Sequence, residues 1–384
     1  MRLLFTTTPG FSHTTPLLPL AHGARLHGHQ VLFAVSGPAA GAARNAGLPT
    51  VDAVPDADVT RPYVTLASTA AREDLPVAET MRMVFSAFGE MSSMMLDGVV
   101  TTARRWRADA VVHTPMLSAG PLAARASGAT SVLHGMGLRH PAFPTPPELA
   151  EDAARRYGID PADRGPHAEL VLAPASLERV NPTAPDTTAP LLPLRPSPDN
   201  GGGRVPAWAL ARGGRPRVVV TLGSVPSHTD GHRNVMATAL DALADDAVEV
   251  VLTTGGAALD ALGPLPPWVR TVDFVPLTSL LPTCDAIVHH GGMGTMFSAL
   301  AARVPQLIVP TTSGDALTNG EVVEKSGTGR VLLPADLSAD ALGAAVRDLL
   351  HAPGHREAVA GVAAEMAAMP GPGAALDALA ALRA

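Results

Sequence analysis

The chain has 384 residues, 46% of them hydrophobic and 16% charged, and its formal net charge is −7. This length fits two domains of ordinary size, and an acidic balance without a basic run excludes nucleic acid as the main partner. The single cysteine excludes an internal disulfide and a cysteine-based metal site, and no apolar run is long enough to span a membrane. The opening residues do not resemble a signal peptide, so we expect a cytoplasmic protein without a stable membrane anchor.

The first segment has the order of a strand, a loop, a helix and a second strand. Residues 2–8 form a short apolar strand, which the loop Pro9-Gly-Phe-Ser-His13 follows. Residues 16–27 carry apolar side chains at helical spacing, Gly28 ends this helix, and residues 31–35 are again a buried strand. This order predicts a βαβ unit of a parallel sheet.

The middle of the first half is rich in methionine. Residues 61–72 lack periodicity, and we expect a loop there. Residues 75–100 hold five methionines among branched and aromatic side chains, which fits either helix packing or a pocket for a flat hydrophobic ligand, because methionine adapts to irregular shapes. The candidate lining residues of such a pocket are Met81, Phe85, Phe88 and His134, the last at the end of a strand that begins at Thr130.

The second half repeats the pattern of the first. Residues 181–216 are crowded with proline and contain Asn200-Gly-Gly-Gly203, so we expect no regular element there. The further predicted strands are residues 110–113, 218–222, 248–253, 271–274, 286–289 and 306–310, and residues 232–244 form a helix. We therefore predict two doubly wound α/β domains of parallel strands, facing each other across a cleft.

The most informative segment runs from Ala286 to Thr295. A buried strand ends at His289 and leads into a turn with glycines at 291, 292 and 294, after which a helix begins. Glycines let the backbone approach a bulky anion, and the N–H groups at the start of a helix bind phosphate. A glycine turn needed only for tight packing would look similar. A P-loop is absent, and the first-half loop lacks the glycine pattern of nicotinamide or flavin sites.

A resemblance to a known family rests on this segment. The stretch from Asp273 to Thr295, with the following Ala301-Ala-Arg-Val-Pro-Gln306, resembles the donor-binding signature of family-1 glycosyltransferases. The branch it is most similar to consists of actinobacterial enzymes that attach deoxysugars to antibiotics and related natural products. The resemblance covers essentially the whole chain. It implies the GT-B fold, with an acceptor-binding domain (1–195), a linker (196–215), a nucleotide-sugar-binding domain (216–368) and a last helix (369–384) that crosses back to the first domain.

The resemblance also implies roles for individual residues. The Phe274 ring lies near the nucleobase and the backbone of Val275 reads the edge of the base. Asp315 contacts sugar hydroxyls, but Ala316 replaces the family's glutamine, which either favours a donor with fewer hydroxyls or reflects drift of the loop. The diphosphate is held without a metal by His289 and the turn, opposite the first turn of the second domain; the residues concerned are Gly223, Ser224, Gly291, Gly292, Met293, Gly294 and Thr295.

His13 is the candidate catalytic base. A neutral imidazole can take the proton of an acceptor hydroxyl as the oxygen attacks the anomeric carbon, and in the resembling family a histidine of this loop does so. The family orients it with an acidic residue at the position that is Thr114 here. A threonine hydroxyl can orient the ring but cannot stabilise its positive charge. Either His13 works with this weaker partner, or another acid reaches it, or the base lies elsewhere, with His113 and His134 as the reserve candidates.

These features predict an inverting, metal-independent glycosyltransferase. The donor is a nucleoside diphosphate deoxysugar, with thymidine diphosphate favoured over uridine diphosphate, and it serves as a co-substrate, so no cofactor is required. The acceptor is a hydrophobic natural product such as a polyketide aglycone, and a homodimer is compatible with the sequence. Two alternatives are a GT-B nucleotide-sugar epimerase and a non-catalytic helper that binds nucleotide sugar and assists another transferase.

Overall fold

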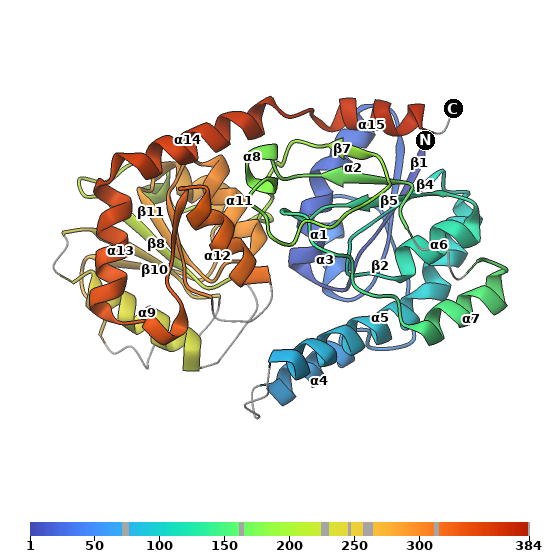
Figure 1. The fold of residues 1–384 in the computed structure, drawn as a ribbon, viewed down its shortest axis with the longest axis horizontal. Coiled ribbons are helices and arrows are strands. Elements are labelled where there is room, and N and C mark those ends of the chain that lie inside the picture. Colours follow the sequence, from blue (N-terminus) through green and yellow to red (C-terminus); the bar gives the residue numbers. More distant parts are fainter. Residues whose placement is uncertain are drawn as a thin grey trace. The chain divides into compact units, whose positions relative to one another are not determined.

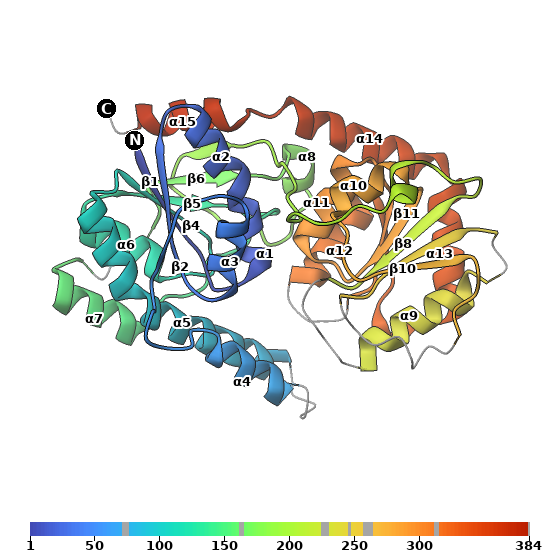
Figure 2. The same ribbon diagram turned by 180° about the vertical axis from the view of Figure 1, so that it is seen from behind.

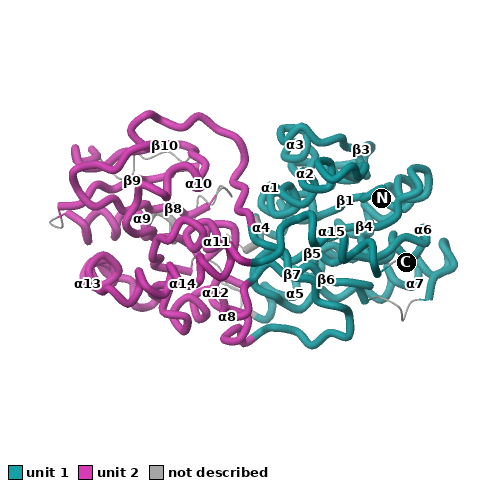
Figure 3. The backbone as a smooth tube through the Cα atoms, turned by 90° about the horizontal axis from the view of Figure 1, so that it is seen from above, with its two compact units in different colours: residues 1–173, 183–196, 369–384 teal, residues 174–182, 197–368 magenta. Residues whose placement is uncertain are grey.

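The computed structural model describes residues 1–70, 77–160, 165–223, 230–244, 247–255, 264–310 and 315–382. The chain forms two compact units (Figure 3). Unit 1 comprises Met1–Ala173, Thr183–Pro196 and Met369–Ala384, and unit 2 comprises Pro174–Pro182 and Ser197–Ala368. The chain therefore passes between the units more than once, and the residues after Met369 belong with the first residues.

Unit 1 is built on a parallel sheet of seven strands in the order β3-β2-β1-β4-β5-β6-β7 (Figure 1). The strands are β1 (Arg2–Thr6), β2 (Gln30–Val35), β3 (Thr50–Asp52), β4 (Ala110–His113), β5 (Thr130–His134), β6 (Ala168–Val171) and β7 (Leu191–Pro193). The chain builds outward from β1 to β3 and then returns to β4 on the other side of β1. The strand order thus reverses between β1 and β4, which is where open α/β sheets bind ligands.

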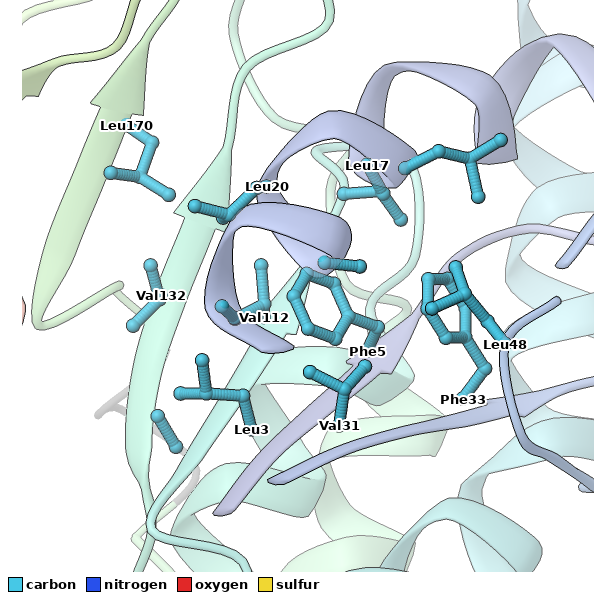
Figure 4. Close-up of a cluster of buried hydrophobic side chains, with 14 of the residues drawn as sticks. Leu3, Phe5, Leu17, Leu20, Val31, Phe33, Leu48, Val112, Val132 and Leu170 are labelled. Carbon is cyan, nitrogen blue, oxygen red and sulfur yellow. The ribbon is translucent and has the colours of Figure 1, made fainter. Parts of the chain in front are cut away.

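Helices cover both faces of this sheet. The helices of unit 1 are α1 (Phe11–Thr14), α2 (Leu18–Leu26), α3 (Pro38–Asn45), α4 (Arg61–Ala70), α5 (Val77–Trp106), α6 (Ala119–Ser127), α7 (Pro147–Tyr157) and α15 (Pro372–Ala381). Side chains alternate along a strand, so Leu3 and Phe5 pack with Leu17 and Leu20 on the α2 face (Figure 4), whereas Leu4 packs with α5 and α6 on the other. Two separate hydrophobic layers therefore hold β1 in the middle of the unit.

The last helix packs on the first long one. A Cβ atom on Gly23 of α2 would collide with Pro372 of α15, so the two helices meet at a glycine. The N–H of Arg195 donates to the carbonyl of Pro370 at 2.7 Å, which fixes the residues before α15 to those after β7. Leu376 and Leu379 complete the hydrophobic layer on this face of the sheet.

Unit 2 has a parallel sheet of six strands in the order β10-β9-β8-β11-β12-β13 (Figure 2). The strands are β8 (Arg217–Thr221), β9 (Glu249–Thr253), β10 (Val269–Val272), β11 (Ala286–His289), β12 (Gln306–Ile308) and β13 (Gly329–Val331). The helices are α8 (Ala175–Glu178), α9 (Asp230–Ala242), α10 (Leu277–Leu280), α11 (Met293–Ala301), α12 (Asp315–Lys325), α13 (Ala339–His351) and α14 (Pro353–Ala368). The order reverses between β8 and β11, as it does between β1 and β4 in unit 1.

The predicted fold class is confirmed, but three local predictions are wrong. Residues 61–70 form helix α4 and not a loop, with the Ser68 hydroxyl donating to the carbonyl of Val64 at 2.8 Å. The proline-rich stretch does contain a strand, β7, which lies at an edge where proline is tolerated. Strand β10 ends at Val272, so Phe274 lies in the loop after the strand.

A test of this packing uses two helical glycines. A Cβ on Gly98 of α5 would run into the backbone of Ala53, whereas nothing lies within 4 Å of a Cβ on Gly41 of α3. Gly98→Ala should lower the free energy of unfolding by about 2 kcal/mol, because the backbone contact cannot yield without moving the helix. Gly41→Ala should raise it by about 0.5 kcal/mol, because alanine restricts the unfolded chain. Urea unfolding measures both, and an equal effect of the two changes would contradict this packing.

Candidate functional site

His13 lies in a short turn that follows β1, where the strand order of unit 1 reverses. The residues after the strand lead directly into α1, in which His13 is the third residue. Gly10 gives the imidazole its place, because a Cβ there would lie 2.8 Å from Cδ2 of His13. The sequence and the sheet topology therefore bring this histidine to the carboxyl edge of the central strand, as predicted.

Two hydrogen-bonded threonine hydroxyls hold this turn in place. The Thr7 hydroxyl donates to the backbone carbonyl of His13 at 3.2 Å and lies 3.0 Å from the Thr114 hydroxyl. Because the single hydroxyl proton of Thr7 is donated to the His13 carbonyl, the hydroxyl of Thr114 must be the donor to the oxygen of Thr7. Thr114, which follows β4, is fully buried. Its hydroxyl therefore positions the backbone of His13 through Thr7, and the expectation that it orients the imidazole ring directly is wrong.

The His13 ring lies in an apolar environment. Its Nδ1 atom is buried and has no hydrogen-bond partner among the residues that the structure describes. Burial lowers the pKa of His13 from its ordinary value to about 4, because desolvation disfavours the imidazolium. The ring is therefore neutral at pH 7, the protonation state that a general base requires.

One aromatic ring of α5 lies beside His13, and three further rings extend from it. The Phe88 centroid lies 6.0 Å from that of His13, and Phe143 packs edge-on against both Phe88 (5.1 Å) and Phe85 (4.9 Å). Tyr63 of α4 completes the group at 6.3 Å from Phe88. Phe88 thus lies beside the candidate base and Phe85 joins it through Phe143, whereas Met81 is a half-buried residue in the first two turns of α5. Sequence reasoning missed Tyr63 and Phe143, which only the tertiary fold brings here.

The two reserve histidines of unit 1 lie inside the protein. His113 is held by the Ser131 hydroxyl at 2.9 Å and by the Thr114 carbonyl, and His134 contacts the Gly135 carbonyl at 2.6 Å. Both side chains are almost fully buried, and burial lowers the pKa of each to about 4. Both residues therefore have the position of core histidines.

In unit 2 the structure corrects the role expected of His289. This side chain is fully buried, its Nε2 lies 2.9 Å from the Gln306 side-chain oxygen, and its Nδ1 accepts the N–H of Gly291 at 3.2 Å. Nδ1 must therefore be unprotonated, and Nε2 donates to Gln306. Burial lowers the pKa of His289 to about 3. With both nitrogens used inside the protein, His289 fixes the glycine turn and cannot donate to a phosphate in this arrangement.

The next residue, His290, lies over the glycine turn. Successive residues of a strand point to opposite sides, so His290 leaves the core where His289 enters it. Its ring packs over two glycines, because a Cβ on Gly292 would lie 2.5 Å from Nε2 and a Cβ on Gly223 would lie 2.9 Å from Cε1.

The first turn of α11 offers free backbone donors. The first helical hydrogen bond is the one from Met296 to the carbonyl of Gly292, and no side chain caps the helix. The N–H groups of Met293, Gly294 and Thr295 therefore have no acceptor within the described part of the chain. Such N–H groups at the positive end of a nine-residue helix are suited to bind an anion.

The glycine turn before this helix is set by close packing. Gly291 has a φ of +93°, and a Cβ there would lie about 3 Å from Ile308 and Ala316. The Asn319 side-chain amide donates to the Gly291 carbonyl at 2.7 Å. Ala316 is thus buried beneath the turn, while Asp315 is exposed at the start of α12. Helix α12 therefore holds the glycine turn in place through Ala316 and Asn319.

Phe274 and Val275 lie in the loop between β10 and α10. The Phe274 ring is 43% exposed and packs over Gly203, where a Cβ would lie 3.0 Å from Cε1. The adjacent Val275 is buried in the core. An exposed aromatic ring suits stacking against a flat heterocycle. Ser224 lies outside the described residues.

The described residues include no group of three or more histidine, cysteine, aspartate or glutamate side chains arranged to hold a metal ion. Within the same ranges, no helix is long and apolar enough to cross a membrane.

Comparisons with known proteins agree along the whole chain. Residues 22–223 and 237–382 match the N-terminal and C-terminal domains described as erythromycin biosynthesis protein CIII-like. The elloramycin glycosyltransferase ElmGT of Streptomyces olivaceus is 34% identical over 97% of this chain and 95% of its own length.

Two solved structures share the fold across their full length. The glycosyltransferase SnogD from Streptomyces nogalater has a TM-score of 0.84 and 36% identity, covering 100% of this chain and 99% of its own. The glycosyltransferase VinC, solved in complex with thymidine diphosphate, has a TM-score of 0.80 and 28% identity with the same coverage.

The different roles of the two neighbouring histidines can be tested by stability. His289→Ala should lower the free energy of unfolding by about 3 kcal/mol, because it opens a cavity and leaves the Gly291 N–H and the Gln306 amide unpaired. His290→Ala should change it by less than about 1 kcal/mol, since its ring is only half-buried. Denaturant unfolding of both variants measures the difference. A larger loss of unfolding free energy in His290→Ala than in His289→Ala would contradict the assignment of His289 to the core.

The buried histidines also predict how stability depends on pH. His13, His113, His134 and His289 have lowered pKa values in the folded chain, so the unfolded chain binds more protons between about pH 6.5 and 4. Stability is therefore complete above pH 6.5 and falls as the pH drops through this window. His113→Gln should reduce the slope by up to about 1.4 kcal/mol per pH unit. The exposed His351→Gln serves as the control, and equal slopes for the two variants would contradict the account.

Proposed function

The chain belongs to the erythromycin biosynthesis protein CIII-like family of GT-B glycosyltransferases, and on this basis we propose that it transfers a deoxysugar from a nucleoside diphosphate to a hydrophobic natural product, inverting the anomeric carbon. Thymidine diphosphate is the proposed carrier of the sugar. The nucleotide sugar is a co-substrate, and no cofactor or metal takes part in the proposal.

The observation that carries this proposal is the set of free N–H groups at the start of α11. Sugar transfer leaves negative charge on the departing diphosphate, and donors that are already oriented toward that charge stabilise it without reorganising. Met293, Gly294 and Thr295 supply three backbone donors, and His290 adds a ring nitrogen beside them. The helix dipole acts in the same direction. Together they would take the charge-stabilising role that a divalent metal has in other transferases.

The identity of the donor is argued from unit 2 and from one relative. The exposed Phe274 suits a nucleobase, whose edge we assign to the backbone of the adjacent Val275, and VinC, a neighbour of the same fold, was solved with thymidine diphosphate. Ala316 carries no hydrogen-bonding group and lies buried against Gly291. A site without a side-chain amide at this position favours a sugar with fewer hydroxyls, which supports a deoxysugar.

His13 supplies the other half of the reaction. The acceptor hydroxyl gives its proton to the imidazole while its oxygen forms a bond with the anomeric carbon. The bond between that carbon and the diphosphate oxygen breaks, and its electron pair leaves with the diphosphate. Attack from the face opposite the leaving group inverts the anomeric centre. The threonine pair beneath the turn would hold His13 in position for this step.

The proposal predicts separate effects on turnover and on nucleotide binding. His13→Ala should lower kcat by roughly 100-fold or more, because proton transfer by a positioned base contributes that much. It should leave the Kd for thymidine diphosphate nearly unchanged, since His13 is not part of the diphosphate site, and EDTA should change neither value. Steady-state kinetics and calorimetric titration measure the two quantities. Unchanged turnover in the variant would remove His13 from the mechanism, and sugar conversion without an acceptor would favour an epimerase.

A further inference from the structure

We propose that the acceptor presents an acidic hydroxyl, a phenol or enol on a flat aromatic ring system, and that aliphatic alcohols are poor acceptors. This inference rests on the proposed function and specifies the substrate of the same site. It combines the surroundings of the His13 ring with the aromatic side chains beside it.

The first observation is that nothing described prepares His13 to carry a positive charge. When Nε2 takes a proton, Nδ1 must also bear one, and a carboxylate beside Nδ1 is the usual means of stabilising that cation. Here Nδ1 is buried without a partner in the described ranges, and Thr114 donates its hydroxyl to Thr7. Desolvation lowers the pKa of His13, and no described charged group raises it.

The second step is a comparison of acid strengths. A base whose conjugate acid has a pKa of about 4 accepts a proton most readily from a donor that is itself acidic. A phenol has a pKa of about 10, as in tyrosine, whereas an aliphatic hydroxyl is close to water and far less acidic. The difference in acidity between the acceptor and the His13 imidazolium is therefore much smaller for a phenol. In addition, a phenol spreads the developing negative charge of its oxygen over the ring, so its deprotonation requires a weaker base than that of an aliphatic alcohol.

The third observation concerns the shape of the ligand. The chain contains only eight phenylalanines, three tryptophans and two tyrosines. Four of these rings nevertheless form one connected group that reaches His13: Phe88 lies beside the imidazole, Tyr63 and Phe143 contact Phe88, and Phe85 contacts Phe143. Phe85 and Phe143 are half-buried and Tyr63 is 41% exposed, so ring surface remains available. Edge-to-face walls of this kind favour another flat ring, and they would place its hydroxyl next to the base.

The proposed step balances without any further reactant. The phenolic O–H bond breaks, its proton passes to Nε2 of His13, and the oxygen lone pair forms the new bond to the anomeric carbon. The bond from that carbon to the diphosphate breaks, and the diphosphate leaves with the electron pair. Loss of the proton from His13 to solvent restores the neutral ring.

The test compares two flat acceptors that differ only in their hydroxyl. The full chain is supplied with thymidine diphosphate-2-deoxyglucose and with either 2-hydroxyanthraquinone or 2-(hydroxymethyl)anthraquinone. We expect kcat/KM to be at least 100-fold higher for the phenol. Equal values, or a preference for the alcohol, would overturn the inference. If the chain binds thymidine diphosphate but glycosylates neither compound, the phenol inference also fails. If it does not bind thymidine diphosphate, the proposed function itself fails.

A second measurement separates acid strength from fit to the aromatic walls. In His13→Ala, turnover of the phenol should recover about tenfold for each pH unit until the phenol ionises, because a preformed phenolate needs no base. Turnover of the alcohol should stay low at every pH. The control, His351→Ala, changes an exposed residue of α13 and should keep the pH profile of the natural chain. If the phenol rate of His13→Ala does not rise with pH, the hydroxyl's acidity is not what the site selects.

Discussion

The proposed diphosphate site of unit 2 depends on three N–H groups at the start of α11 that have no acceptor in the described part of the chain. The N-cap residue of this helix is Gly292, which offers no capping side chain and follows a strand of the buried sheet. The turn that aims them depends on Gly291, whose left-handed backbone lies against Ile308 and Ala316. His289 holds the Gly291 N–H from inside, and His290 covers the turn outside. A negatively charged ligand satisfies this arrangement, which is the physical basis for assigning a diphosphate to it.

Unit 1 uses the same sheet topology for a different purpose. Its strand order also reverses at the central strands, and the first residues beyond β1 and β4 meet there. These residues form the Thr7–Thr114 hydroxyl pair and the turn that carries His13. In this unit burial keeps the imidazole neutral, and no charged group among the described residues shifts its pKa. The proposal therefore assigns proton acceptance to one unit and charge stabilisation to the other.

Much of the fold could be read from the sequence, because buried parallel strands and glycine-ended helices leave strong periodic signals. The strands 110–113 and 286–289 were placed at their observed bounds, and the family resemblance was confirmed. Short edge strands such as β7 left no periodic signal, and α4 has an irregular pattern of polar residues. At the site, the sequence could not show which of two adjacent histidines enters the core, nor that Phe143 would reach Phe88 from a distant loop. Such facts depend on tertiary contacts, and the roles of the site residues stay predictions.

The most direct test of the central claim is a crystal structure of the chain with thymidine diphosphate, grown in EDTA. The account predicts that oxygens of the diphosphate accept hydrogen bonds from the N–H groups of residues 293–295 and from His290, with the thymine beside Phe274. A nucleotide bound elsewhere on the chain, or a diphosphate whose charge is met by side chains away from α11, would contradict it.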